Sequence, residues 1–390
     1  MDVVLAGPLP PPISGPELVT ETLLSMGSRV DIHYVHLNLS ARSNVSRGRW
    51  SLDGIVRALG QGIHFTWVAW KWRGRAKIVH LPLAQSNSGV LRDLVLFRVA
   101  KFFGYKVLVQ FHGGDFERFW ERCRYRGFVA RTLARVDTLL VFDARIKSQF
   151  PFVSAKRVAV FPNPVPVGWT RDFLALPIRQ TAHQPLRILF VSHISVAKGF
   201  LDLVEALVRL PKSYAWELHV AGDRIDVERN IVWTGTNMDD GWMRAAEVLK
   251  ARGLMDRMIY HGVVSADAKQ ALFRTGHVLV LPSYSEGLPI VILEAMYAGL
   301  AVISTKVGAI PSLLPPSVLV NPGDIRTLST LMAKLDPILC EEWGKTNRER
   351  MEQGYLPHQV LEKLRSLYES MDSRHPPINW AERIPRRESH

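Results

Sequence analysis

Short apolar segments alternate with helix-like segments along most of the chain, in two successive series. The first series of expected strands covers residues 3–6, 30–35, 78–81, 106–111, 138–142 and 157–161. The second series covers residues 187–191, 216–221, 258–260, 278–281, 301–304 and 318–320. The clearest helical patterns cover residues 17–26, 52–72 and 128–134. Because strands separated by helices pair in parallel, we expect an α/β protein with helices on both faces of its sheets.

A proline-rich segment at residues 162–168 separates the two series. The pattern predicts two Rossmann-like, doubly wound domains in tandem, facing a central cleft, since ligands of such sheets bind beyond the carboxyl ends of the strands. We expect a first domain at 1–168 and a second at 169–355. A helix at 356–372 and a tail at 373–390 follow.

The composition is that of a globular protein, with 47% hydrophobic and 22% charged residues. Two cysteines, Cys123 and Cys340, are too few for a disulfide scaffold and too far apart for a zinc motif. No apolar run reaches the ~18 residues of a membrane-spanning helix. The short apolar segment at the start has no basic residues before it, unlike a secretory signal, so a cytoplasmic location is expected.

The positive charge is concentrated in the first half of the chain. Residues 1–170 hold 23 basic and 11 acidic residues, a balance of +12, whereas the whole chain carries +13. A one-sided field of this kind predicts an anionic partner: nucleic acid, an acidic lipid surface or a phosphorylated substrate.

Basic and aromatic residues are interleaved between residues 42 and 77. Only Asp53 opposes the basic residues Arg42, Arg47, Arg49, Arg57, Lys71, Arg73, Arg75 and Lys77. The aromatic residues among them are Phe65, Trp67, Trp70 and Trp72. Two interpretations stay open: peripheral binding to an anionic membrane face, or tryptophans packed on the sheet beside solvated arginines. Nucleic-acid binding is not favoured, since no recognised motif for it is present.

The segment 282–296 carries the sharpest motif. An apolar strand ends in a polar turn that holds Glu286 and Gly287, and Pro289 stands where a helix is expected to begin. The backbone amides of Leu288, Ile290 and Val291 would form an anion site at the helix N-terminus. Glu294 follows Glu286 by eight residues, so both carboxylates can face one cleft. The alternative is that Glu286 caps the helix and Glu294 is an ordinary solvated residue.

Three further motifs follow expected strands. In the first, His193 precedes Lys198 and Gly199, and the lysine can donate to a phosphate where the next helix begins. In the second, His112 precedes two glycines, which allow a ligand to approach the backbone closely. The third is the proline-rich loop near the start, which ends in Ser14-Gly15-Pro16.

Together these motifs resemble those of the retaining glycosyltransferases of family 4, which have the GT-B fold. The resemblance rests on the segment Ser285–Glu286–Gly287–Leu288–Pro289, four apolar residues and Glu294. It implies that Glu294 binds the nucleotide ribose of the donor. Glu286 and the backbone at Gly287 and Leu288 would hold the donor sugar, with Pro289 and Ile290 completing the donor site.

The same resemblance assigns roles to the other motifs. Lys198 would bind the donor diphosphate, with His193 standing where the family usually has arginine. His112 would contact the transferred sugar, and Gly15 would lie in the phosphate-side glycine loop. Ser312 replaces the glutamate of another family motif. The first domain would bind the acceptor, the second the nucleotide sugar, and the C-terminal helix would return to the first domain.

The function implied is a retaining transferase that moves a sugar from a nucleotide-diphosphate sugar to an acceptor, such as a lipid-linked glycan. No metal or other cofactor is expected, because the sequence has no Asp-x-Asp motif for a divalent ion. Two alternatives remain: a nucleotide-sugar epimerase of the same fold, and a noncatalytic subunit that binds sugar or lipid.

Overall fold

The computed structural model describes residues 1–11, 14–40, 52–172, 185–224 and 241–372. The chain divides into two compact units: unit 1 is residues 1–167 with the chain from Gly354 onward, and unit 2 is Gly168–Gln353. The expected tail at 373–390 and the basic residues Arg42, Arg47 and Arg49 lie outside the described residues. Within the described part of the chain, none of the helices is both long and apolar enough to cross a membrane.

Unit 1 is built on a parallel sheet with the strand order β2-β1-β3-β4-β5-β6. Its strands are β1 (Asp2–Gly7), β2 (His33–Asn38), β3 (Ile78–Leu83), β4 (Lys106–Phe111), β5 (Thr138–Val141) and β6 (Val158–Val160). The strand expected at 30–35 begins later. Val30 ends a 3-10 turn, and Asp31 adopts a left-handed conformation with φ of 53°, which no strand residue has.

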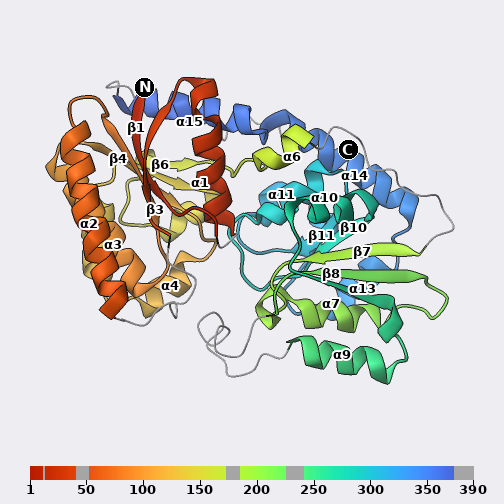
Figure 1. The fold of residues 1–390 in the computed structure, drawn as a ribbon. Coiled ribbons are helices and arrows are strands. Elements are labelled where there is room, and N and C mark those ends of the chain that lie inside the picture. The colour runs from red at the N-terminus through yellow and green to blue at the C-terminus, as the bar shows by residue number, and fades with distance from the viewer. Residues whose placement is uncertain (12–13, 41–51, 173–184, 225–240, 373–390) are drawn as a thin grey trace. The chain divides into compact units, whose positions relative to one another are not determined.

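Helices cover both faces of this sheet (Figure 1). One face carries α2 (Leu52–Trp72), α3 (Asn87–Phe102) and α5 (Arg126–Leu133). The other carries α1 (Gly15–Met26) and α15 (Pro357–Asp372), and α4 (Phe116–Arg122) follows β4. The sequence pattern does not predict α3, whose apolar residues are spread around the helix. Its start is fixed locally by Ser86, whose hydroxyl accepts a hydrogen bond from the Gly89 amide.

Unit 2 repeats the architecture with the strand order β12-β11-β10-β7-β8-β9. Its strands are β7 (Leu186–Val191), β8 (Trp216–Ala221), β9 (Met258–Gly262), β10 (Val278–Leu281), β11 (Ala301–Thr305) and β12 (Leu319–Val320). Helices α7 (Phe200–Leu207), α9 (Gly241–Ala251) and α13 (Ile325–Met332) lie on one face. The remaining helices are α6 (Val167–Asp172), α10 (Ala266–Thr275), α11 (Ile290–Tyr297), α12 (Ile310–Leu313) and α14 (Pro337–Gly354).

All strand pairs of the two sheets in the described residues are parallel, so the expected α/β class with two doubly wound units is confirmed. In each sheet the chain winds first in one direction from a central strand and then in the other. The winding reverses between β1 and β3 in unit 1 and between β7 and β10 in unit 2. Ligands of doubly wound sheets bind beyond the carboxyl ends of the strands at such a reversal.

A buried polar network joins α15 to the sheet of unit 1. His80 Nδ1 lies 2.7 Å from the Tyr368 hydroxyl, and His80 Nε2 lies 3.0 Å from Gln110 Oε1. Burial lowers the pKa of His80 to about 3, so the ring is neutral at physiological pH. A neutral ring fits both contacts, because Nδ1 can accept from the tyrosine while Nε2 donates to the glutamine.

We expect Tyr368→Phe to destabilise unit 1 by about 1–3 kcal/mol, because it leaves the buried Nδ1 of His80 without its donor. Chemical denaturation followed by circular dichroism measures the change. Tyr125→Phe, which removes a hydroxyl from a partly exposed tyrosine of the same unit, is the control. Equal effects of the two substitutions would contradict a structural role for the network.

Candidate active site

In unit 2, three loops pack tightly against one another beyond the carboxyl ends of β7, β10 and β11. The backbone of Gly199 approaches Pro282 so closely that a Cβ would lie 2.1 Å from the Pro282 carbonyl oxygen, and Gly199 has φ of 72°. Gly308 approaches Glu286 in the same way, again with 2.1 Å between a Cβ and a carbonyl oxygen. Only glycine fits at these two positions, so the loops are locked together.

Lys198 and Glu286 form an ion pair at this meeting point. Lys198 Nζ lies 2.6 Å from Glu286 Oε1, and the two side chains are only 16% and 9% exposed. The hydroxyl of Ser283 donates to the same oxygen over 2.8 Å. Two residues that lie 88 positions apart in the sequence are thus brought together, as the assignment of both to one donor site requires.

Glu294 lies on α11 and is held by a different set of partners. Its Oε1 accepts from Trp169 Nε1 over 2.8 Å and from Lys269 Nζ over 2.6 Å. With 2% of its surface exposed, Glu294 is a buried carboxylate and not the solvated residue of the alternative interpretation. Burial of a carboxylate requires such pairing, because removing it from water is costly.

Sequence reasoning misses both partners of Glu294. Lys269 lies on α10 and Trp169 on α6, 25 and 125 residues before the glutamate. The indole of Trp169 also packs edge-on against Phe273, with 5.0 Å between ring centroids. The only sequence signal was indirect: a carboxylate with apolar neighbours on both sides needs a partner from elsewhere in the chain.

The helix start expected at Pro289 is shifted by one position. Pro289 is the N-cap of α11, and the first helical residue is Ile290. The fixed φ of proline, here −65°, still suits this place because the residue needs no amide hydrogen there. Leu288 is buried, and the carbonyl of Gly287 accepts a hydrogen bond from the Ala309 amide over 2.8 Å. His193 lies in the loop after β7 and is partly exposed.

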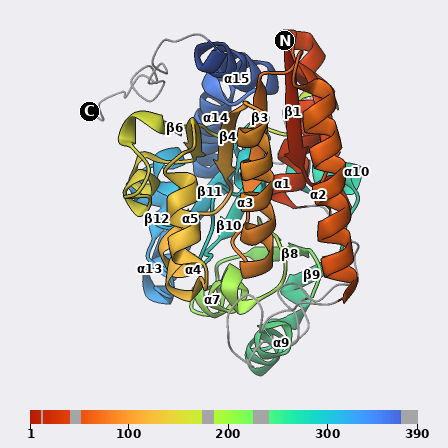
Figure 2. The same ribbon diagram turned by 90° about the vertical axis from the view of Figure 1, so that its left-hand side faces the viewer.

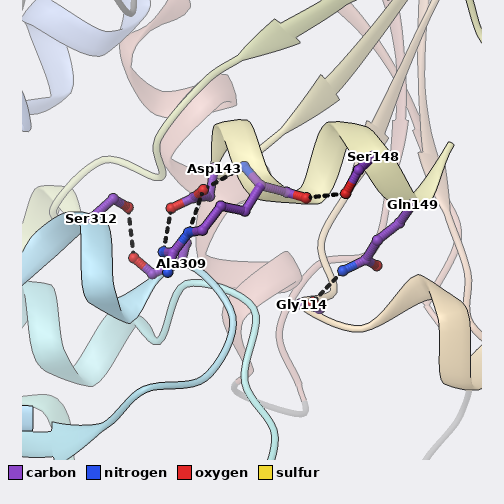
Figure 3. A network of polar contacts seen from close by, with 7 residues as sticks. Gly114, Asp143, Ser148, Gln149, Ala309 and Ser312 are labelled. Atoms are coloured by element: carbon purple, nitrogen blue, oxygen red, sulfur yellow. Dashed lines mark hydrogen bonds and ion pairs between the residues drawn. The ribbon is translucent and has the colours of Figure 1, made fainter.

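In unit 1, the loop that carries His112 follows β4 and is fixed by two glutamines. Gln85 donates to the carbonyl of Asp115, and its side chain fills the space beside Gly113, where a Cβ would lie 2.3 Å from Oε1. Gln149 donates to the carbonyl of Gly114 over 3.3 Å (Figure 3). Gly113 therefore admits a glutamine side chain to the backbone, and the carbonyl of Gly114 accepts a hydrogen bond from a second one.

The residues that position Gln149 are themselves held by a buried carboxylate. Asp143 is 4% exposed and accepts a bidentate pair of hydrogen bonds from Arg145, at 3.0 and 2.7 Å (Figure 3). These hydrogen bonds raise the pKa of Arg145. The hydroxyl of Ser148 closes the same 3-10 turn on the Arg145 carbonyl.

A small cavity lies between the ends of β1, β3 and β4, where the winding of unit 1 reverses. Its lining includes Gly7, Thr20, His80, Gln110 and His112. Burial lowers the pKa of His112 to about 4, so its ring is also neutral near pH 7. Gly15 begins α1 on the same side of the sheet, with Pro16 in the first turn.

Ser312, which stands where the resembling family has glutamate, makes a local contact in unit 2. Its hydroxyl donates to the carbonyl of Ala309 over 2.7 Å, within the short helix α12 (Figure 3). Among the expected site residues of unit 2, the structure joins Lys198 directly to Glu286. It places Glu294 in a separate cluster with Lys269 and Trp169.

We expect unit 1 to become less stable as the pH is lowered, because two of its histidines stay neutral in the folded state. An unfolded histidine takes up a proton near pH 6.5, whereas folded His80 and His112 resist protonation down to about pH 3 and 4. Stability is therefore complete above about pH 6.5 and is lost below it, by up to ~1.4 kcal/mol per pH unit for each histidine. Hydrogen exchange of unit 1 between pH 7 and pH 5 measures the slope. His112→Asn should lower the slope of stability against pH by the amount that corresponds to about one proton. An unchanged slope would contradict the low pKa of His112 in the folded protein.

We expect Lys269→Met to destabilise unit 2 by about 3–5 kcal/mol, because it leaves the charge of Glu294 buried without its cation. Adding Glu294→Gln should restore much of the loss, since the amide carries no charge. Denaturation of unit 2 compares both with Lys250→Met, which alters an exposed lysine on α9. A Lys269→Met effect no larger than that of the control would mean that the buried pair is not needed.

Comparison with known proteins finds a family model that matches most of unit 2. Residues 185–335 match the family model described as glycosyl transferases group 1. The phosphatidylinositol N-acetylglucosaminyltransferase gpi3 subunit of Schizosaccharomyces pombe is 27% identical over 236 residues, covering 57% of this chain and 45% of the relative. The amylovoran biosynthesis glycosyltransferase AmsK of Erwinia amylovora is 23% identical over 269 residues, covering 66% and 60%. The matches span about half the length of these curated relatives.

Solved structures resemble the chain over nearly its whole length. Sucrose-phosphate synthase from Thermosynechococcus elongatus has a TM-score of 0.68 at 17% identity, with 95% of this chain and 99% of that one covered. HepE of Anabaena, solved in complex with UDP, has a TM-score of 0.66 at 14% identity, with 95% and 99% covered. At such identities the likeness establishes the fold. The chain has the GT-B fold, and its residues 185–335 match the model of the glycosyl transferases group 1.

Proposed function

We propose that this protein is a retaining, metal-independent glycosyltransferase of family 4, which moves a sugar from a nucleotide-diphosphate sugar to a lipid-linked glycan acceptor. The observation that carries the proposal is the Lys198–Glu286 pair, set where the winding of the unit 2 sheet reverses. Ligands of doubly wound sheets bind at this place.

The pair is suited to exchange partners when a donor binds. A diphosphate offers Lys198 a more highly charged partner than Glu286, and the three N–H donors of the ammonium can serve it. Glu286 then becomes free to accept hydrogen bonds from sugar hydroxyls, while Ser283 keeps it oriented. The N-terminus of α11 adds a favourable dipole for the phosphates.

Glu294 is proposed to bind the ribose. Its contacts with Trp169 and Lys269 both end on Oε1, so Oε2 takes part in neither of them. A carboxylate held on one oxygen by two donors is oriented before the ligand arrives. That orientation lowers the entropy lost on binding.

His112 is proposed to contact the transferred sugar as a neutral ring. A pKa of about 4 makes it a hydrogen-bonding group at pH 7 and not a source of positive charge. In the front-face reaction that we favour, the acceptor hydroxyl gives its proton to the departing phosphate oxygen as the new glycosidic bond forms on the same face. Positioning and charge stabilisation by Lys198 then supply most of the catalysis. Gly15 and His193 are proposed to lie on the phosphate side.

The absence of an Asp-x-Asp motif from the sequence supports a reaction without a bound metal, with Lys198 neutralising the leaving group. The acceptor class is suggested by relatives. One is named for N-acetylglucosaminyl transfer involving phosphatidylinositol and another for amylovoran biosynthesis. Together with the positive charge of residues 1–170, these names favour an acceptor at a membrane surface, on the cytoplasmic side.

The decisive experiment measures release of nucleoside diphosphate from UDP-, GDP- and ADP-sugars, with and without membrane lipid extract. UDP-sugars come first because HepE binds UDP. We expect release with one donor, stimulated by lipid, and a loss of about 10²-fold or more in Lys198→Ala, since the cation acts on charge that develops in the transition state. Lys345→Ala, at an exposed lysine of α14, is the matched control and should keep full activity.

Two readouts of the same reaction test its finer features. Product NMR should show the anomeric configuration of the donor, and excess EDTA should leave the rate unchanged. Inversion or metal dependence would overturn those parts of the proposal. No release with any donor from folded protein would favour a noncatalytic binding subunit, and isomerised donor without transfer would favour an epimerase.

A further inference from the structure

Helix α2 of unit 1 exposes an apolar face to solvent. Val56, Leu59, Ile63, Trp67 and Trp70, which we call the α2 stripe, are between 51% and 73% exposed. Their spacing of three, four, four and three residues places them on one side of the helix. The basic and aromatic pattern of the sequence had pointed to the two tryptophans but not to the three aliphatic residues before them.

The opposite side of α2 is firmly packed, so the stripe is not a loosely docked core face. Phe65, Val68 and Ala69 are buried, and the hydroxyl of Tyr105 donates to the carbonyl of Ala69 over 2.7 Å. Phe65 therefore belongs to the core, whereas Trp67 and Trp70 are exposed. The interpretation that the tryptophans of this segment pack on the sheet is wrong for these two residues.

Cations border the tryptophan end of the stripe. Lys71 Nζ lies 4.7 Å from the ring centroid of Trp67, and the Arg73 guanidinium lies 5.5 Å from that of Trp70. Arg75 lies 5.9 Å from the Trp72 ring. No Asp or Glu occurs in the sequence between residues 54 and 92, so these charges have no acidic neighbour along the chain. Such cation–π pairs leave the cations available to phosphate groups on the solvent side.

The neighbouring helix α3 adds to the apolar surface. Figures 1 and 2 both show α2 and α3 side by side on the same face of the unit 1 sheet. Phe102 near the end of α3 is 84% exposed, and Val95, two turns earlier on the helix, is also exposed. Apolar exposure of this kind on adjacent helices is unusual for a surface that contacts only water.

We propose that the α2 stripe inserts into the headgroup region of an anionic lipid bilayer, with α2 lying in the plane of the surface. From Val56 to Trp70 the stripe runs ~21 Å along the helix, at 1.5 Å per residue. Aliphatic residues enter the acyl boundary, tryptophans lie at the interface, and Lys71, Arg73 and Arg75 bind lipid phosphates. A second copy of the chain is a poorer occupant, because it would bring two unopposed basic surfaces together.

This surface brings unit 1 to the compartment where a lipid-linked acceptor resides, but the inference does not depend on the reaction. Bilayer binding is measured without donor, and binding of UDP in solution is measured separately. If bilayer binding fails, the measurement of UDP binding can still be interpreted, and the reverse also holds.

The test is co-sedimentation with vesicles of phosphatidylglycerol and phosphatidylcholine, compared with phosphatidylcholine alone. We expect binding to the anionic vesicles that weakens as salt is raised. Ile63→Glu should lower the partition coefficient by about tenfold or more, because it puts a charge at the centre of the inserted face. Ile338→Glu, at an exposed isoleucine of α14 in unit 2, is the matched control and should bind as the wild type does.

A second measurement guards against misfolding of the variant. Brominated lipids should quench the fluorescence of wild-type protein, and Trp67→Phe with Trp70→Phe should remove most of that quenching while the thermal melting curve is kept. The proposal is overturned if the wild type fails to bind anionic vesicles at low salt, or if Ile63→Glu binds as tightly as Ile338→Glu. A wild-type dimer in solution that Ile63→Glu dissociates would assign the stripe to a second copy instead.

Discussion

The approach of Gly199 to the carbonyl of Pro282 is the contact on which the candidate site depends. It joins the loop after β7 to the loop after β10, at the reversal of winding in the unit 2 sheet. With any side chain at Gly199 the two loops would separate, and Lys198 would lose its 2.6 Å contact with Glu286. The ion pair is therefore a consequence of backbone packing. Gly308 makes a similar close approach to the backbone carbonyl of Glu286, so the backbone that carries this carboxylate is also held by the loop after β11.

Several charged or imidazole groups of the two units have surroundings that suit their ionisation state. Glu294 and Asp143 are buried and each receives a cation, from Lys269 and Arg145 respectively. His80 is buried and His112 partly so, and removal from water lowers both pKa values below the physiological range. The same physical cost, removal of charge from water, produces ion pairs in one case and neutral rings in the other. This matching gives unit 1 a sensitivity to acid that is separate from the chemistry of unit 2.

Helix α2 differs from this pattern, because it leaves apolar groups exposed to water. Phe65, Val68 and Ala69 on its inner side are buried, but its outer side leaves aliphatic and indole groups in water beside three cations. A bilayer surface satisfies both features at once, because it offers an apolar interior below a layer of phosphates. On this account, unit 1 provides attachment and acceptor access, while unit 2 provides the charge complementarity for a nucleotide sugar.

Local patterns in the sequence determined the class of the fold, most strand positions, the final helix and the motif residues Lys198, Glu286 and Glu294. These are predictable because strand periodicity, glycine turns and helix starts depend on residues that are close together in the sequence. The helix α3 was missed because its apolar residues do not keep to one side, and the strand expected at 30–35 began late because Asp31 takes a left-handed turn. Only the tertiary structure decided that Trp169 and Lys269 hold Glu294, that Tyr368 holds His80, and that Phe65 is buried while Trp67 is exposed. Each of these contacts joins segments that are far apart in the sequence. Local patterns in a single sequence do not predict which distant segments come into contact.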